Sequence, residues 1–418
     1  MTKLTHENFI KARDYIFANS DDINRAWFRY NFEDEDTGAF MDALAKYQHN
    51  DGGFGGLFYE FDYQGPCLKS TEIAIGYILN LKEKPSVNHP VIQNMMKYIL
   101  ERYHPEIGNW GDPAVPEVND GVYNHWVRYR GDAIIPIENE DERIGKYDAN
   151  EKACFAAFVA LYSELVPEEL YQDIIKYPVE YILRYWDENS PYYKKEIFDD
   201  GTPYDFEYFQ WFVSCLKDKD IAEKLTAILC QNPTAFMELD YAKSDADYVH
   251  LPCDSINSPD NIVYPVVKDL VDDSLLYRMK QQSDDGRWPL GWPLGEGEGF
   301  RKLQILGEAS RTMGMLAKLK LAACGIDCNE CGSYKVTTEH DMQSAELIID
   351  WFKDRGWIGE DDTAEAVVKL APLCTGCWNV ERSNAFLYQH GICVDCHYRN
   401  CCVEKGINHC GECNDFPC

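Results

Sequence analysis

The segment FMDALAKYQHNDGGF (residues 40–54) contains the pattern that decides the fold. Counted from Phe40, apolar residues recur at offsets 0, 3, 4 and 7, which predicts an amphipathic helix with one buried face. Gln48 follows this helix, and Gly52 and Phe54 follow Gln48. Glycine adopts the positive φ that ends a helix, the aromatic ring can pack back onto the helix end, and the Gln amide can bond its open carbonyl groups. The segment therefore predicts a helix closed by a tight turn.

The same pattern occurs at two further places. An amphipathic stretch at residues 92–103 leads through His104 to Gly108-Asn109-Trp110, and another at 271–279 leads through Gln282 to Gly286-Arg287-Trp288. His104 lies 56 residues after the equivalent Gln of the first copy, and Gln282 lies 178 residues further on, about three such intervals. A period of this length holds two ordinary helices and their loops. We therefore expect five or six helical hairpins before the C-terminal region.

These turns resemble known repeats. Gln48-x3-Gly52-x-Phe54 and Gln282-x3-Gly286-x-Trp288 are similar to the Q-x3-G-x-W repeats of squalene and oxidosqualene cyclases and of protein prenyltransferase β subunits. Those families share the α/α toroid, a ring of about six helical hairpins. The resemblance implies an all-α chain in which residues 1–321 form such a toroid. It implies fold far better than activity, because α/α toroids host unrelated chemistries.

The catalytic groups of the resembled families do not carry over. The cyclases use an Asp-x-Asp-Asp cluster, and the closest segment here, Glu360-Asp361-Asp362, has Gly359 where the first Asp should be. These acids, with Thr363, are typical of a helix N-terminus before Ala364. The Asp, Cys and His zinc ligands of the prenyltransferases cannot be matched in order either. The sequence therefore leaves open whether the protein is an enzyme.

Polar loops at helix ends supply candidate acid/base groups that a ring would gather around its mouth. One loop follows the first turn and another is rigidified by prolines; their candidate catalytic residues are Glu60, Asp62, Glu117, Asp120 and His125. Trp110 and Trp126 are candidates to wall an apolar or sugar-like ligand. The alternative is that these acids cap helices, because paired carboxylates are frequent in a sequence this acidic.

The cysteines divide the chain. Of 17 Cys, twelve lie from Cys324 onward and five are scattered before it, which predicts a separate domain at residues 322–418. Four C-x2-C pairs and three further cysteines give the candidate metal ligands Cys324, Cys328, Cys331, Cys374, Cys377, Cys393, Cys396, Cys401, Cys410, Cys413 and Cys418. A C-x2-C turn presents two thiolates to one metal ion. Cys402, next to Cys401, is left as a spare or reactive thiol.

Zinc is the favoured metal, because the thiols are paired and His397 and His409 are spare ligands. An iron–sulfur cluster is the alternative, since it accepts the C-x2-C-x4-C spacing. Disulfides suit secreted domains and are disfavoured here. The arrangement Cys324-x3-Cys328-x2-Cys331 and the closing Cys410-x2-Cys413-x4-Cys418 resemble a bacterial and archaeal Cys-rich domain family of unknown function, which implies metal binding.

Charge and hydropathy exclude several partners. The chain has 40 Lys+Arg against 71 Asp+Glu, a net charge of −31, and no basic run for nucleic acid or an anionic membrane. No apolar run of 18 residues is present, so no membrane span is expected. Residues Met1–Tyr15 lack a signal-peptide core, and we expect a cytoplasmic protein.

Two functions stay open at this point. One is a protein that binds an apolar isoprenoid-like or glycan-like ligand in the toroid cavity and, as an enzyme, transforms it. If the metal is an iron–sulfur cluster, this enzyme would carry out a redox reaction. The other is a scaffold whose ring holds a peptide or small molecule while the metal domain supports docking. The sequence fixes neither the substrate nor the oligomeric state.

Overall fold

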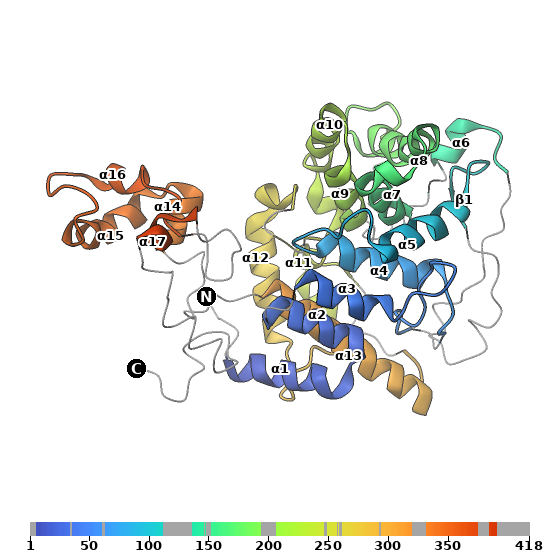
Figure 1. Cartoon of the computed structure of the whole chain (residues 1–418), viewed down its shortest axis with the longest axis horizontal. Helices are drawn as coiled ribbons and strands as arrows, with labels where there is room; N and C mark the ends of the chain where they lie inside the picture. The colour runs from blue at the N-terminus through green and yellow to red at the C-terminus, as the bar shows by residue number, and fades with distance from the viewer. Residues whose placement is uncertain are drawn as a thin grey trace. The chain divides into compact units, whose positions relative to one another are not determined.

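The computed structural model of the protein describes residues 6–33, 36–60, 63–111, 136–145, 147, 152–193, 206–245, 249–256, 258, 261–291, 294–319, 332–374 and 384–390. These residues form helices joined by turns and loops, with one short two-stranded antiparallel ladder (Figure 1). The all-α prediction is therefore confirmed. The chain divides into two compact units, of which the larger contains Ile10–Lys318 and the smaller contains Leu319–Cys418.

Taken in chain order, the described helices of the larger unit can be grouped into six pairs if the six-residue α6 is left out and the four-residue α11 is counted as the partner of α10. The pairs are α1 (His6–Asn19) with α2 (Asp22–Phe32), α3 (Thr37–Ala45) with α4 (Leu68–Asn80), α5 (Pro90–Glu101) with α7 (Lys152–Leu161), α8 (Glu168–Tyr181) with α9 (Phe206–Cys215), α10 (Lys219–Leu229) with α11 (Pro252–Ser255), and α12 (Tyr264–Lys280) with α13 (Glu298–Lys318). Shorter elements are β1 (Tyr103–His104), β2 (Asn109–Trp110), α6 (Glu140–Gly145), η2 (Ser163–Leu165), η3 (Ile182–Trp186), η5 (Pro233–Phe236) and η6 (Tyr241–Asp245).

The second helices of these pairs contact one another in turn. Trp27 of α2 meets Tyr77 of α4 edge-on, with ring centroids 5.3 Å apart. Helix α7 packs against both α4 and α9, and all its residues between Lys152 and Leu161 are buried. The amide of Gln210 in α9 donates a hydrogen bond to the carbonyl oxygen of Ser255 in α11 at 3.3 Å. These contacts connect five of the six second helices.

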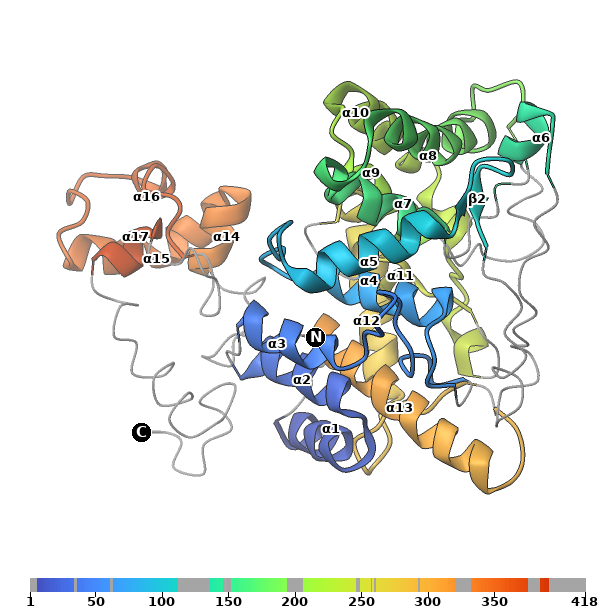
Figure 2. The same cartoon turned by 45° about the vertical axis from the view of Figure 1, so that its right-hand side comes forward.

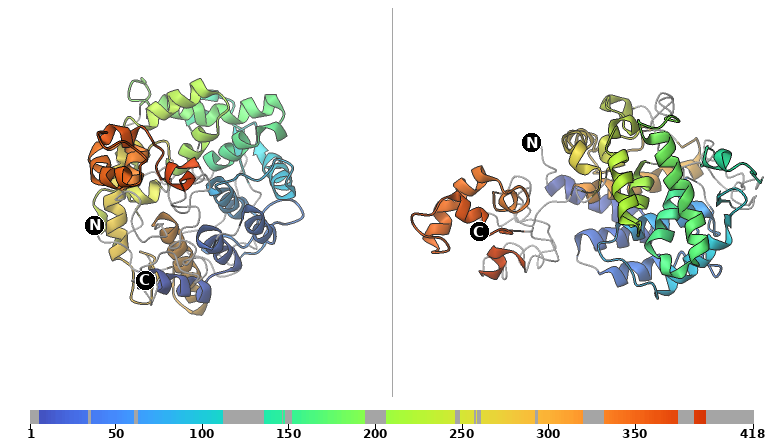
Figure 3. Two further views of the ribbon diagram at one scale, coloured as in Figure 1. Left: turned by 60° about the vertical axis from the view of Figure 1, so that its left-hand side comes forward. Right: turned by 90° about the horizontal axis from the view of Figure 1, so that it is seen from above.

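The circuit of helices closes on itself. An ion pair between Lys318 and Asp254 joins α13 to α11, with 3.5 Å between the charged atoms, and α13 packs against α2. In Figures 2 and 3, the orange helix α13 accordingly lies beside the blue helix α2. The hydroxyl of Tyr15 in α1 also donates to Glu308 of α13 at 3.3 Å. The first and last helices of the larger unit are therefore neighbours.

Two of the predicted turns have the same surroundings. Gly52 has a φ of +96°, and a Cβ there would lie 2.0 Å from the carbonyl oxygen of Asn94 in α5. Gly286 has a φ of +94°, and its Cβ would lie 2.2 Å from the carbonyl carbon of Lys11 in α1. Each turn therefore needs a glycine both for its backbone conformation and for the closeness of the helix it touches. The last turn packs against the first helix of the chain.

The turn side chains are placed in part as the sequence predicted: the aromatic rings are buried, but the Gln amides bond the turn and not the open carbonyl groups of the helix end. Gln48 Nε2 donates to the carbonyl oxygen of Gly52 at 3.0 Å, and Gln282 Nε2 donates to that of Gly286 at 2.8 Å. Phe54 and Trp288, the aromatic residues after these glycines, have no exposed surface. Trp110, the aromatic residue of the third turn, is 1% exposed. Their backbone N–H groups donate to equivalent threonine hydroxyls, on Thr71 and Thr312. The predicted burial of the aromatic residue is thus confirmed at these positions, whereas the predicted bond from the Gln amide to the helix end is wrong, because a glycine carbonyl of the turn accepts it.

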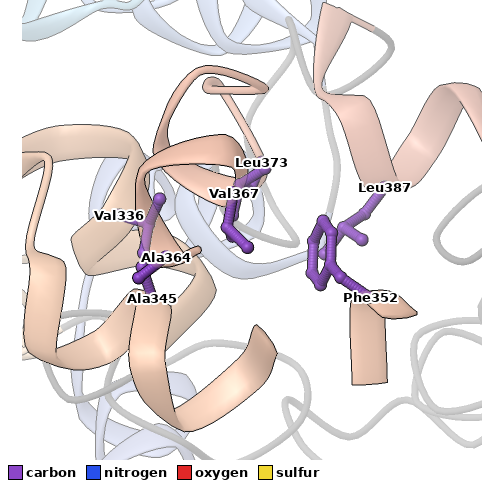
Figure 4. Packing of buried hydrophobic residues seen from close by; sticks show 7 residues of the cluster. All are labelled: Val336, Ala345, Phe352, Ala364, Val367, Leu373 and Leu387. Atoms are coloured by element: carbon purple, nitrogen blue, oxygen red, sulfur yellow. The ribbon is translucent and has the colours of Figure 1, made fainter. Parts of the chain in front are cut away.

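The smaller unit has its own core. Its helices are α14 (Gly332–Glu339), α15 (Met342–Asp354), α16 (Ala364–Val368) and α17 (Phe386–Gln389). Seven buried side chains pack together, as Figure 4 shows: Val336, Ala345, Phe352, Ala364, Val367, Leu373 and Leu387. Helix α15 contributes Ala345 and Phe352 to this core, and the acidic segment predicted to precede a helix ends at Thr363, the N-cap of α16.

Candidate functional site

Most residues selected from the sequence lie outside the described part of the chain. These are Asp62, Glu117, Asp120, His125, Trp126 and every candidate metal ligand except Cys374. Glu60, Trp110 and Cys374 are described. Within the described ranges, no group of three His, Cys, Asp or Glu side chains is placed to hold a metal ion. The predicted acid/base loops and metal sites therefore stay predictions.

Trp110 has the surroundings of a core residue. Its indole Nε1 donates to the carbonyl oxygen of Ile99 at 3.1 Å, and its ring packs against Tyr103 and Phe155 at centroid distances of 5.1 and 5.4 Å. Trp288 makes the equivalent indole bond to the carbonyl oxygen of Arg278. Trp110 therefore helps to close its turn. A ligand-binding role for Trp110 stays a prediction, and its contacts with the described residues do not support it.

A pocket of about 280 Å³ lies where α11, α12 and α13 meet. One face of α13 forms a wall of it, on which the small residues Gly307, Ser310 and Gly314 recur at spacings of three and four. A Cβ added at Gly314 would meet no atom within 4 Å, whereas one at Gly307 would lie 2.6 Å from the ring of Tyr59, so this face is open at Gly314 and closely packed at Gly307. Tyr59 contributes from the loop that precedes the half-buried Glu60. One predicted catalytic residue is thus the chain neighbour of a lining residue.

Charged side chains surround this pocket. Arg278 of α12 is 3% exposed, and its Nη2 lies 2.5 Å from Oδ2 of Asp254 in α11. Lys318 Nζ lies 3.5 Å from the other oxygen of the same carboxylate. Arg311 of α13 also lines the pocket and is half-buried. Three cations thus face one carboxylate in a small volume.

The protonation states follow from burial and from these charges. Burial raises the pKa of Asp254, but Lys318 and Arg278 outweigh burial and hold the pKa below its usual range, so the carboxylate is ionised at neutral pH. Burial lowers the pKa of His250, another lining residue, to about 4, and its imidazole is neutral at pH 7. Burial also lowers the pKa of Arg311, whose guanidinium nevertheless stays charged. Among the described lining residues, three cations and one carboxylate therefore leave an excess of two positive charges.

Arg278 has a donor without an acceptor. Its Nη2 serves Asp254, and its Nη1 donates to Gln281 Oε1 at 3.0 Å. Its buried Nε has no hydrogen-bond partner among the described residues. A buried N–H group left unpaired costs about 1–3 kcal/mol.

Sequence reasoning missed this site. Asp254, Arg278 and the Arg311–Lys318 segment come from three different helices and share no motif. The sequence held one signal for the pocket, the spacing of Gly307, Ser310 and Gly314 within one helix. Small residues on one helical face allow another group to approach the helix closely. Cys253, beside Asp254, is no part of the chemistry: the thiol has no exposed surface, and burial raises its pKa to about 11.

Comparison with known proteins bears on the smaller unit. Residues 320–418 match the model of a family described as "Protein of unknown function (DUF3795)". The expectation that the C-terminal region resembles an uncharacterised domain family is therefore confirmed. No curated protein and no solved structure matches the chain. Among the described helices, none combines the length and the apolar character that crossing a membrane requires.

Proposed function

We propose that the larger unit is an α/α toroid that binds a small molecule in the pocket between α11, α12 and α13. The closed circuit of helix pairs supports the toroid, as does the equivalence of the turns at Gly52 and Gly286. The sequence resemblance to cyclase and prenyltransferase repeats points the same way. The sequence predicted an apolar ligand. We keep an apolar part in the proposed ligand, because Leu290 and Met315 line the pocket beside its charged residues.

The buried charge network is the observation that carries this proposal. Arg278 is almost fully buried and pairs with Asp254, which is itself largely enclosed, with 21% of its side chain exposed. Buried ion pairs are often no more stabilising than apolar residues of the same volume, because both charges lose their hydration. A network of this kind lining a pocket is better explained by ligand binding than by stability.

A chemical step on the ligand is the finer part of the proposal. Glu60 is the described candidate for carboxylate acid/base chemistry, because Tyr59 brings this part of the chain to the pocket wall. Replacement of Glu60 by Gln removes a proton-transferring group and changes little in size. If Glu60 acts on the ligand, Glu60→Gln retains binding while turnover of the bound compound falls by about 100-fold or more.

Occluding the pocket tests the binding function. In Gly314→Leu the new side chain extends into the pocket from α13, where a Cβ meets no other atom. We expect a ligand that co-purifies with the wild-type protein, detected by native mass spectrometry, to be absent from this variant. Gly314→Ala is the matched control, because it leaves most of the pocket volume free. Retention of the same bound mass in Gly314→Leu, with an unchanged circular dichroism spectrum, would contradict the proposal.

For residues 322–418 we propose that the cysteines bind zinc. The described core of this unit is small, and ligation supplies folding free energy to domains of this size. Cys374 is compatible with a ligand position: it follows the core residue Leu373, and its N–H donates to Thr337 Oγ1 at 2.9 Å, which fixes the backbone there. Other contacts of a metal centre would come from cysteines outside the described residues.

Metal analysis of the full chain tests this second proposal. Eleven candidate thiols predict a colourless protein with about two to three zinc ions. An iron–sulfur cluster would instead give a brown protein that absorbs near 400 nm and contains iron and sulfide in equal amounts. Purification in parallel with and without oxygen separates a lost cluster from one that was never present.

A further inference from the structure

The charge of the pocket is opposite to that of the chain. Across the whole chain acidic residues exceed basic ones by 31, whereas the pocket wall combines Arg278, Arg311 and Lys318 with a single carboxylate, Asp254. Like-charged groups held close together repel one another, so three cations gathered in one small space need a counter-charge. One carboxylate neutralises one of them, and a ligand with two negative charges would neutralise the remainder.

The available donors favour tetrahedral oxyanions. Two guanidinium groups and one ammonium group line the pocket, and guanidinium groups form paired hydrogen bonds with phosphate oxygens. Arg278 already donates from Nη2 to Asp254 at 2.5 Å. An oxyanion in the pocket would therefore share the charge of Arg278 with Asp254, which acts as the internal counter-ion when no ligand is bound.

The rest of the wall is suited to an organic group. Leu290, Met315 and the ring of Tyr59 line the same pocket as the three cations. The volume of about 280 Å³ lies near the lower end of the range for small-molecule sites and exceeds what a free inorganic ion needs. A ligand with a charged head and a short, largely apolar body would use both parts of the wall.

Resting on the proposed small-molecule function, we propose that this pocket binds an organic phosphate monoester, with its phosphate held by Arg278, Arg311 and Lys318. A phosphate monoester carries −1.5 to −2 charges near neutral pH, which matches the excess of two positive charges. Asp254 keeps Arg278 in place and shares it with the phosphate. Leu290 and Met315 contact the ester group.

Calorimetric titration of the full-length protein tests the ligand class. The probes are butyl phosphate, inorganic phosphate and succinate, which compare an ester, its head group alone and a dicarboxylate. We expect butyl phosphate to bind at least tenfold more tightly than either of the others. The affinity for butyl phosphate should fall about tenfold or more in Arg311→Gln, because a charge-assisted hydrogen bond is worth about 1.5–3 kcal/mol.

Lys302→Gln is the matched control. It removes one positive charge from the same helix at an exposed position that does not line the pocket, so the affinity should change less than twofold. No binding of butyl phosphate, or equal weakening in Arg311→Gln and Lys302→Gln, would overturn the proposed site. Equal affinities for butyl phosphate and inorganic phosphate would overturn the assignment of an ester, and tighter binding of succinate would overturn the choice of phosphate.

These failures differ from a failure of the proposed function. If Gly314→Leu loses a co-purified ligand that contains no phosphorus, the pocket binds a small molecule and only its phosphate class is wrong. If Gly314→Leu retains every ligand and also binds butyl phosphate like the wild-type protein, both the pocket function and the ligand class are wrong.

Discussion

Asp254 is the residue that holds two of the pocket cations, Arg278 and Lys318, in place. In Asp254→Asn the two cations lose their shared carboxylate while Arg278 stays buried. Removing one partner of a buried pair is strongly destabilising, and we expect the free energy of unfolding to fall by about 3 kcal/mol. Urea denaturation measures this change. Inorganic phosphate should stabilise the variant more than the wild-type protein, because it returns negative charge to the same cations.

The control for this variant is Asp272→Asn on α12. Asp272 pairs with Lys268 at 2.8 Å on the surface, where the two side chains are 28% and 45% exposed. Surface pairs of this kind contribute less than about 1 kcal/mol. Equal losses in Asp254→Asn and Asp272→Asn would show that the pocket network is no more important than a surface ion pair.

His250 makes stability depend on pH. Burial lowers the pKa of its imidazole to about 4 from the ordinary 6.5, so the folded protein binds this proton more weakly than the unfolded chain does. The contribution of the neutral imidazole is therefore fully present above pH 6.5 and is lost as the pH falls toward 4. We expect the free energy of unfolding to decrease by about 2 kcal/mol between pH 6.5 and 5 from this residue. In His250→Gln, denaturation curves at the two pH values should lack that part of the decrease.

At the scale of elements, the turns decide how the helices fit together. Gly286 has a φ of +94° and lies against the backbone of α1, whereas Gly297 has a φ of +107° and open space around it. Gly297→Ala therefore adds only backbone strain, about 1–2 kcal/mol. Gly286→Ala adds the same strain and a collision with Lys11, and we expect it to cost at least 2 kcal/mol more. Thermal unfolding of the two variants gives the comparison, and similar midpoints would contradict the assigned packing.

The turns were predictable from the sequence, and the pocket was not. Gln48, Gly52 and Phe54 lie within seven residues, so one local pattern predicts a helix, its end and the aromatic side chain that packs against that end. The apolar segment of α7 was equally readable, because burial on all sides leaves no polar stripe. Asp254 and Arg278 come from different helices, and only the path of the backbone brings them together. Local patterns therefore predicted elements, while the charge network depends on long-range packing.

Acidic composition also concealed the pocket. With a net charge of −31, the chain gave no indication of a cationic site, because three cations hardly alter the overall balance. The candidate acids Glu60, Glu117 and Asp120 were chosen for residue type and loop position. The residues that line the pocket include no other described carboxylate than Asp254. Asp254 is therefore distinguished from the other acids by its position in the fold, and not by the residues next to it in the sequence.

For the whole molecule, two units with separate cores predict two responses to metal removal. The larger unit contains the helix pairs, and the smaller contains the candidate metal ligands from Cys324 onward. If zinc stabilises the smaller unit, a strong chelator should abolish one calorimetric transition and leave the transition of the larger unit within about 2 °C of its original midpoint. Zinc added back should restore the lost transition. Loss of both transitions together would contradict separate stabilisation.

The contact between Tyr15 and Glu308 spans 293 positions of the chain. A ribosome that adds 5–20 residues per second needs roughly 15–60 s to pass from one partner to the other. During that interval the earliest helices have emerged, but the surface that covers them does not yet exist. The nascent polypeptide thus exposes apolar side chains of its first hairpin until translation is three-quarters complete. During this period, a chaperone that recognises exposed apolar side chains would bind this hairpin.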